Sequence, residues 1–302
     1  MVLIHRSPRC RLAAALGVVT SICCLMTAWG LQSSSPSLLA EKQIFVKQQT
    51  KFQMAVPAVK PQVKLLSAGV EPRQELRFKP LVNSRQTGIM TMNMHMAMSM
   101  AGQPMPTVKL PATVITMNTV VTQIDPNGDI HFKFSYPNVD VVGDSTVPPK
   151  VLEAMRSQLK KITGMGGSFI VDNRGQNKGG NFVFPQEIDA QIKQQISDSI
   201  NQMSSPLPEE AIGIGSRWQT TSLGNFRGTK ATQTATYELL NLQDGVATLN
   251  VSVQQQAQPQ TLKQPGLPSG ATLTLRSLNS QGKGQVIVPL NQLLPIRSRV
   301  VS

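Results

Sequence analysis

Polar and apolar residues alternate along much of this chain, which is the pattern of a half-buried β-strand. The alternation is clear in residues 75–79 and 129–136, and residues 114–124 are rich in Val, Ile and Thr. The turn Asn127-Gly128 lies between the last two segments, and such a turn between β-prone runs is a strong signal for a hairpin. Further strands are predicted in segments of the same kind, at residues 218–221, 233–241, 246–254, 271–278 and 285–290. The pattern therefore predicts a chain made mainly of antiparallel strands.

Two segments have the period of a helix instead. The first begins near Pro148 and ends near Gly164, and its apolar stripe consists of Val151, Leu152, Met155, Leu159 and Ile162. The second covers about residues 185–203 and carries isoleucine at four-residue spacing, at Ile188, Ile192, Ile196 and Ile200. Each helix has one apolar face, so each is predicted to pack on a sheet or groove by that side alone.

The two strand-rich regions resemble each other weakly. Residues 119–136 are similar to residues 237–253, and residues 167–185 are similar to residues 270–289, in the same order along the chain. Two interpretations are open: a duplicated hairpin unit, or a chance likeness between hairpins that share turn chemistry. We expect an α+β fold, in which a curved, half-barrel-like antiparallel sheet is built from two related halves and carries two amphipathic helices.

Methionine occupies every second position from Met90 to Met100. On an extended strand these side chains would share one face at a spacing of about 7 Å, whereas on a helix they would scatter around the axis. The segment is therefore predicted to be a strand whose methionines face inward, with His95 on the opposite face.

Three interpretations of this methionine stripe compete. It can be an ordinary core face, or a flexible wall for an apolar ligand such as a lipid. It can also supply thioethers to Cu(I), in which case Met92, Met94 and Met96 would need help from Met105 or Met117, because neighbours on one strand are too far apart to share an ion. The apolar-ligand hypothesis combines the stripe with the aromatic face of the next hairpin and the isoleucine face of the second helix, that is Met90, Met92, Met94, Met96, Met98, Phe132, Phe134, Tyr136, Ile188, Ile192 and Ile196.

Residues 1–30 have the pattern of an export signal. Three arginines precede an uncharged, largely apolar run from Leu12 to Gly30, which ends in small residues. The run is also long enough to stay in the membrane as an anchor, and Cys23 and Cys24 raise lipidation as a third possibility, although the residues before them fit it poorly. In each case we expect the rest of the chain in the periplasm or outside the cell, either free or tethered to the inner membrane by residues 12–30.

Residues 31–61 are polar and without a sustained period, so we expect a disordered linker before one β-rich domain at 62–302, with half-repeats at about 62–205 and 206–302. Without residues 1–30 the chain keeps 26 basic against 16 acidic residues. Such a surface is either simply solvated or drawn to an anionic membrane surface or cell-wall polymer. A nucleic-acid partner is not expected, because no aromatic residues accompany the cations and the compartment is wrong.

Signatures of catalysis are missing from the sequence. All three cysteines lie within residues 1–30, and only His95 and His131 remain after them. No zinc spacing, phosphate-binding loop or nucleophile elbow is present, so we expect no enzyme and no cofactor. A hydrolase would be an alternative only if the fold brought distant carboxylates together.

A short motif carries a resemblance to known proteins. Leu207-Pro208, Gly213 and Trp218 resemble a signature of uncharacterised exported bacterial β-rich proteins, in which these residues mark the start of the second half of the domain. The layout of hairpins and helices is also similar to that of the half-barrel lipoprotein carriers of the LolA/LolB kind, where a curved sheet holds acyl chains against covering helices. The resemblance implies a non-enzymatic envelope protein that binds an apolar ligand between sheet and helix, although a fold does not fix a function and a purely structural role is the other expectation.

Overall fold

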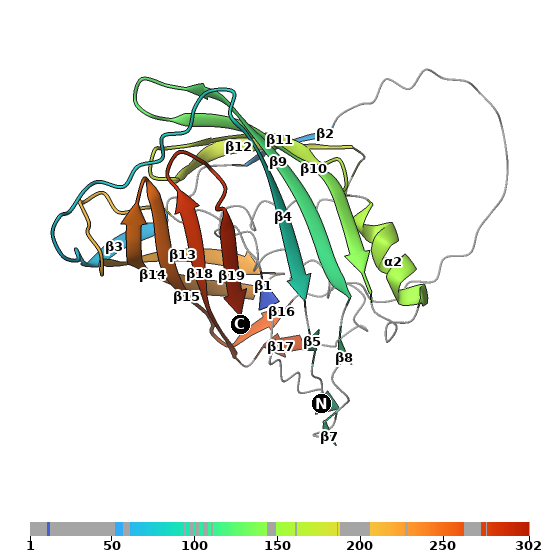
Figure 1. Cartoon of the computed structure of the whole chain (residues 1–302). Helices are drawn as coiled ribbons and strands as arrows, with labels where there is room; N and C mark the ends of the chain where they lie inside the picture. The colour runs from blue at the N-terminus through green and yellow to red at the C-terminus, as the bar shows by residue number, and fades with distance from the viewer. Residues whose placement is uncertain are drawn as a thin grey trace, which may run out of the picture.

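The computed structural model describes residues 11–12, 52–56, 61–93, 95–96, 99–100, 103–104, 108–109, 111–143, 149–160, 162–185, 187, 206–226, 229–262, 273–275 and 277–301. Within these ranges the chain is mainly β-structure, with one helix, α2 (Pro149–Leu159). Figure 1 shows the strands wrapped into a strongly curved sheet, with α2 beside it. The prediction of a mainly antiparallel sheet is confirmed.

One half of the sheet, which we call the first arm, is a meander of five consecutive strands with a sixth at its edge. The five are β4 (Arg85–Asn93), β9 (Ala112–Ile124), β10 (Ile130–Val142), β11 (Gly166–Val171) and β12 (Asn177–Phe184), and β2 (Phe52–Val56) pairs with β12. The predicted turn at Asn127-Gly128 joins β9 to β10, and Gly128 has a φ of 87°, a conformation that glycine adopts without strain.

The second arm repeats this arrangement. Its meander consists of β13 (Arg217–Phe226), β14 (Thr229–Gln243), β15 (Val246–Ala257), β18 (Leu278–Pro289) and β19 (Arg297–Val301), and β3 (Gln62–Ser67) pairs with β13. Asp244 and Gly245 both have positive φ, as the two central residues of a type I′ hairpin do, and they join β14 to β15.

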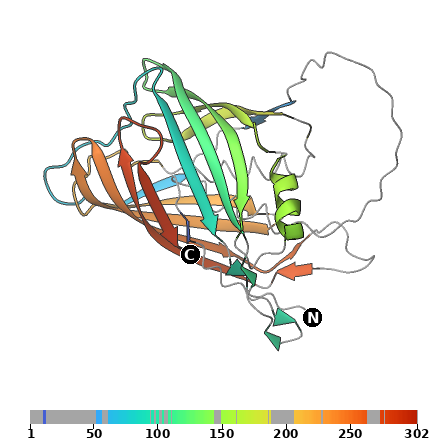
Figure 2. The ribbon, with the colours of Figure 1, turned by 45° about the vertical axis from the view of Figure 1, so that its right-hand side comes forward.

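A very short strand joins the two arms. β1 (Arg11–Leu12) pairs with β4 on one side and with β19 on the other. The two ends of the sheet are β2 and β3, which do not pair with each other, so the sheet is open. Figure 2 shows the two arms facing each other across the curve. β1 lies inside the segment that the sequence predicts to be an export signal.

Short ribbons extend the sheet on one side. β5 (His95–Met96) pairs with β8 (Val108–Lys109), and β6 (Ser99–Met100) pairs with β7 (Gln103–Pro104), so that the hairpin of β4 and β9 continues beyond the sheet. The extended conformation predicted for the methionine segment is therefore confirmed at the residues described. β16 (Gln260–Leu262) and β17 (Leu273–Leu275) form a second ribbon.

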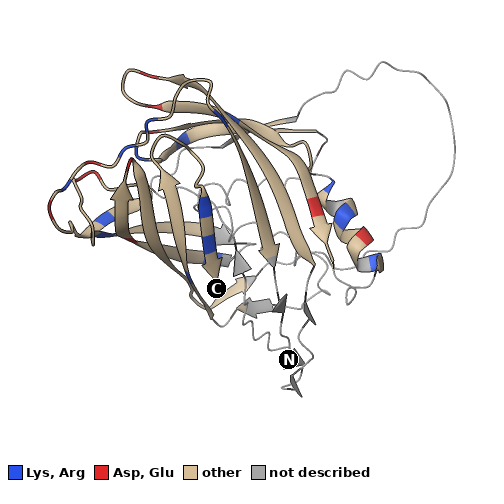
Figure 3. Cartoon of the chain, viewed as in Figure 1, with Lys and Arg blue, Asp and Glu red and all other residues tan. Residues whose placement is uncertain are grey.

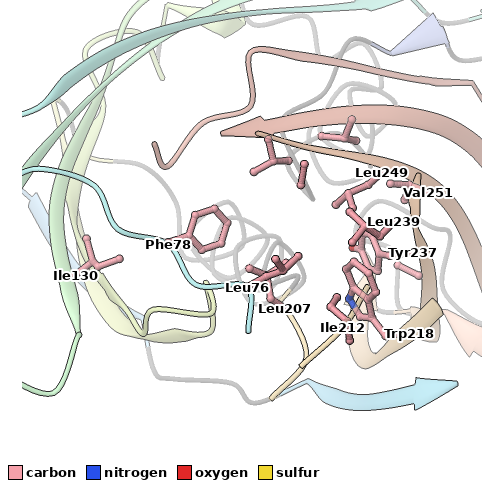
Figure 4. Close-up of a cluster of buried hydrophobic side chains, with 14 of the residues drawn as sticks. Leu76, Phe78, Ile130, Leu207, Ile212, Trp218, Tyr237, Leu239, Leu249 and Val251 are labelled. Atoms are coloured by element: carbon pink, nitrogen blue, oxygen red, sulfur yellow. The ribbon is translucent and has the colours of Figure 1, made fainter. Parts of the chain in front are cut away.

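Two hydrophobic cores hold the fold. Core 1 lies on the inner face of the first arm and contains side chains of β4, β9, β10, β11, β12 and α2. Core 2 joins the arms, since Val121 and Ile130 of the first arm belong to it together with a larger group from the second arm. Figure 4 shows Leu76, Phe78, Leu207 and Ile212 between Ile130 on one side and the side chains of the second arm on the other.

The Leu-Pro to Trp motif has a structural explanation in core 2. Leu207, Ile212 and Trp218 are all at least 95 % buried, and the Trp218 ring stacks on Tyr237 with centroids 5.3 Å apart. Gly213 lies against the backbone of Val70, where a side chain would collide. The motif therefore packs residues 206–216 against residues 68–78, which fill the space between the arms.

Four expectations from the sequence, on the linker, the second helix, the repeats and a membrane span, are compared with the structure next. β2 lies within the predicted linker 31–61, so that prediction is wrong for these five residues, which are stabilised by ladder hydrogen bonds to β12. The second predicted helix lies almost entirely in residues that the structure does not describe. Residues 119–136 and 237–253 occupy equivalent second and third strands of the two meanders, but residues 270–289 do not match β11 and β12, because β17 leaves the main sheet. No helix among the described residues has the length and apolar character needed to cross a membrane.

Candidate functional site

The methionine stripe begins on the inner face of the first arm. Along β4, Met90 and Met92 are 8 % and 4 % exposed, whereas Ile89 between Gly88 and Met90 is 69 % exposed. Both methionines belong to core 1, and Met90 lies opposite Ile115 of β9 in the sheet register. The predicted inward orientation is therefore observed at Met90 and Met92.

Aromatic side chains of β10 continue this apolar face. Phe134 and Tyr136 are buried in core 1, and Phe132 is half-buried against it. The ring centroids of Phe134 and Tyr136 are 5.6 Å apart in an edge-to-face arrangement, which favours aromatic pairs beyond the area that they bury. The structure thus brings together five of the predicted site residues: Met90, Met92, Phe132, Phe134 and Tyr136.

Three further phenylalanines complete the wall and were missing from the predicted site. Phe169 of β11 and Phe182 of β12 lie 5.7 and 5.2 Å from Phe134, and Phe184 stacks on Phe182 at 5.9 Å. The alternation in Phe182-Val183-Phe184 was a usable signal for a strand with one aromatic face. That this strand lies close to β10 depends on the order of strands in the sheet, and a periodic sequence pattern does not predict that order.

Glycines on β11 and β12 allow these rings to lie flat on the sheet. An added Cβ at Gly167 would come within 2.8 Å of the Phe134 ring, and one at Gly180 within 2.6 Å of the Phe169 ring. Both positions lack a side chain where a ring covers the backbone. The result is a dense aromatic surface backed directly by the sheet.

Polar groups in this surface include the hydroxyl of Tyr136 and the side chains of Thr113 and Thr119 on β9, which are buried opposite Met92 and Phe134. Burial raises the pKa of Tyr136 to about 12, because the phenolate would be poorly solvated there. Among the described residues, none hydrogen-bonds to the hydroxyl, although the backbone amide of Tyr136 donates to Met165. The neutral phenol is therefore available as a donor within an apolar wall.

Helix α2 covers the end of the wall near Tyr136. Leu159 is buried in core 1, and Leu152, Met155 and Ile162 pack against it, as the predicted stripe required. Arg156 ties the helix to β10, since its guanidinium donates to Asp140 Oδ1 at 3.2 Å and to the Val141 carbonyl at 3.0 Å. The pKa of Asp140 is lowered, chiefly by the Val141 amide and also by Arg156.

The other predicted site residues are not brought into the wall. Met94, Met98, Ile188, Ile192 and Ile196 lie outside the described residues, and for Met96 the structure describes only its backbone in β5, opposite Val108. The alternative of a Cu(I) site loses one of its proposed ligands, Met117. Met117 lies opposite Gly88 in the register, so it is four residues from the level of Met92, a separation of about 14 Å along the strand.

Titratable groups elsewhere form ion pairs at turns and loops. At the β9–β10 turn, His131 Nε2 lies 2.7 Å from Asp125 Oδ2, and Lys178 Nζ lies 2.6 Å from Asp129 Oδ2. In the part of the chain described, no group of three or more His, Cys, Asp or Glu side chains could hold a metal ion. His131 is thus placed on the polar outer side of the hairpin, as its strand pattern predicted, and not in the wall.

The carboxylate of Asp125 gives the fold a pH dependence. Hydrogen bonds from His131 and Gln123 lower the pKa of Asp125 below its ordinary value of 3.8. A carboxylate with a lowered pKa in the folded state stabilises the fold above its ordinary pKa, and that contribution is lost as the pH falls through the folded value. The free energy of unfolding in urea should fall between pH 5 and pH 3, and we expect this fall to be smaller in Asp125→Asn. Glu153→Gln on α2 is the control. An unchanged pH profile in Asp125→Asn would contradict this role.

Comparison with known proteins adds one match. No curated protein and no solved structure matches the chain. A family model matches residues 186–291. This segment begins just after β12 and includes β13 to β18, that is most of the second arm, but not the methionine and aromatic wall of the first arm. The model is that of DUF6263, a family of unknown function.

Proposed function

We propose that this protein is a non-enzymatic, exported envelope protein that binds an apolar ligand, such as a lipid acyl chain, on the inner face of the first arm. The observation that carries the proposal is the continuous apolar wall formed by Met90, Met92, Phe134, Phe169 and Phe182 on four strands. From β4 to β12 the wall extends over about 20 Å, which suits an extended hydrocarbon chain.

The chemistry of the wall supports a loosely specified apolar ligand. Methionine side chains are flexible and polarisable, so they adapt to chains of different length and saturation. Aromatic rings add a large apolar contact area. The hydroxyl of Tyr136 supplies a neutral donor for the oxygen atoms of a lipid head group or carboxyl, and α2 covers the wall near this hydroxyl.

The export pattern supports the same function. Residues 12–30 have the character of a signal or anchor, and no cysteine follows Cys24. A protein outside the cytoplasm without a disulfide framework depends on its packed cores for stability. Its access to membrane lipids follows from the same location.

Lipid content of the natively purified protein is the direct test. The full chain is purified without detergent, extracted with organic solvent and analysed by mass spectrometry. We expect a lipid or fatty acid at a constant molar ratio to protein across preparations. Extracts without lipid, together with no binding of a fluorescent long-chain fatty acid, would show that the wall is only a core.

Paired substitutions on β4 test the location of the site. We expect Met90→Gln with Met92→Gln to weaken fatty-acid binding roughly tenfold or more, because a buried amide without a partner costs about 1–3 kcal/mol. Ile89→Gln on the exposed face of the same strand is the matched control and should bind normally. Met92→Leu keeps the apolar volume and should also bind; its failure would favour a role for sulfur over the proposed one.

A further inference from the structure

The C-terminal part of the chain contains no acidic residue. Asp244 is the last carboxylate in the sequence, and five basic residues follow it, at Lys263, Arg276, Lys283, Arg297 and Arg299. The last three lie on β18 and β19, and β4, the strand beyond β1, is also without Asp or Glu. Figure 3 shows the basic residues of β19 as blue bands near the C-terminus.

The register places these cations on one face of the sheet. Arg297 and Arg299 are exposed and alternate with buried Ser298, while Val300 packs inward against core 1. Lys283 of β18 is also exposed and lies opposite Val301, so it is a diagonal neighbour of Arg299 at about 7–8 Å. The three cations therefore form one cluster on the outer face of the β18–β19 hairpin.

Several other arginines of the molecule have acidic partners, which these three cations lack within the described part of the chain. Arg77, Arg156 and Arg174 are each within 3.2 Å of a carboxylate. Over the described ranges, Lys283, Arg297 and Arg299 make neither an ion pair nor a side-chain hydrogen bond. Their charge is thus uncompensated by the fold, and the surface retains a local positive potential.

Exposed aliphatic side chains adjoin the cluster. Ile296, directly before Arg297, is 66 % exposed, and Val301, directly opposite Lys283, is 39 % exposed. Ile287, opposite Arg297, is half-buried on the same face. Cations flanked by exposed aliphatic residues match a membrane surface, where the former meet anionic head groups and the latter enter the boundary with the acyl chains.

We propose that the outer face of the β18–β19 hairpin docks the protein on an anionic lipid bilayer. The cations attract the anionic head groups, and salt screens this attraction. Ile296 and Val301 supply an apolar contribution to binding that salt does not screen. A soluble anionic polymer is the less favoured partner, because it would gain nothing from the exposed aliphatic residues. This docking is independent of the apolar ligand on the inner face of the first arm.

Vesicle co-sedimentation with the full chain tests the proposal. Binding to vesicles of phosphatidylcholine alone is compared with binding to vesicles containing about one third phosphatidylglycerol. The difference measures the anion-dependent part, because the apolar residues 12–30 are present in every variant and contribute to both. Each basic residue near an anionic surface is worth about a fivefold change in affinity, so Lys283→Gln, Arg297→Gln and Arg299→Gln together should weaken anion-dependent binding by roughly 100-fold. The difference between the two vesicle types should also fall steeply as the salt concentration rises.

Matched variants make the result decisive. Lys64→Gln, Lys150→Gln and Lys230→Gln remove the same charge from β3, α2 and β14, and should leave binding to anionic vesicles almost unchanged. Ile296→Ser with Val301→Ser should weaken vesicle binding but not binding to a soluble polyphosphate. Equal losses in the two charge variants would overturn the proposed surface, and full vesicle binding by the aliphatic variant would identify a polymer site in place of a membrane site.

Discussion

Replacing Trp218 by alanine is expected to lower the free energy of unfolding by about 3–5 kcal/mol. Trp218 is 1 % exposed, stacks on Tyr237 and occupies the region of core 2 where residues 206–216 meet the second arm. Its removal leaves a cavity that rigid strands on one side cannot fill. Urea unfolding, followed by far-ultraviolet circular dichroism, measures the loss.

Trp218→Phe separates ring packing from indole chemistry. The Nε1 atom of Trp218 is buried and has no hydrogen-bond partner among the residues that the structure describes, so its removal by phenylalanine forfeits no bond there and relieves an unsatisfied donor. We expect a clearly smaller loss for Trp218→Phe than for Trp218→Ala. Equal losses would mean that the indole, and not the aromatic stack, stabilises core 2.

Gly213→Ala is expected to destabilise the fold by about 3 kcal/mol, at the upper end of the effect of overpacking. The added methyl would collide with the carbonyl oxygen of Val70 and approach the Pro72 carbonyl oxygen at 3.1 Å. Val70 is fixed by its amide, which donates to the Ile214 carbonyl at 2.9 Å, so the two backbones cannot separate without losing that bond. The unfolding free energy in urea is again the measurement.

Gly215→Ala provides the matched control two residues away. Gly215 has a φ of 78°, and no atom of the described part of the chain lies within 4 Å of an added Cβ, so the substitution introduces only the strain of a left-handed alanine, about 1–2 kcal/mol. If Gly215→Ala destabilises as much as Gly213→Ala, the close approach of the two segments is not the reason for glycine in the motif.

Local patterns predicted the strands and the orientation of side chains well. The period of two at Met90 and Met92 indicated both the strand and its inward face, because alternation is a property of the backbone and needs no partner. The Asn127-Gly128 hairpin and the stripe of α2 were found for the same reason. These elements account for part of the candidate wall.

The rest of the site depends on information that local patterns lack. Phe182 reaches Phe134 only because β11 lies between β10 and β12 in the sheet. The strand at residues 52–56 forms on the edge of β12, more than 120 residues away in sequence, and its own five residues, Phe-Gln-Met-Ala-Val, are too few to show a sustained period. Likewise, the similarity between 167–185 and 270–289 does not place the two segments in equivalent strands, because β17 pairs with β16 in a separate ribbon.

The two-residue strand β1 would be lost if residues 1–30 were removed as an export signal. A chain cut after Gly30 would lose Arg11 and Leu12, and with them the backbone pairs that connect β4 to β19. The uncut chain holds both arms in one ladder. After such a cut the arms would be held by core 2, by Val300 against core 1 and by the hydrogen bonds of Gln86 to residues 292–294, and the edges of β4 and β19 would be unpaired. Such a cut would thus divide the continuous sheet into two sheets whose neighbouring edges are β4 and β19.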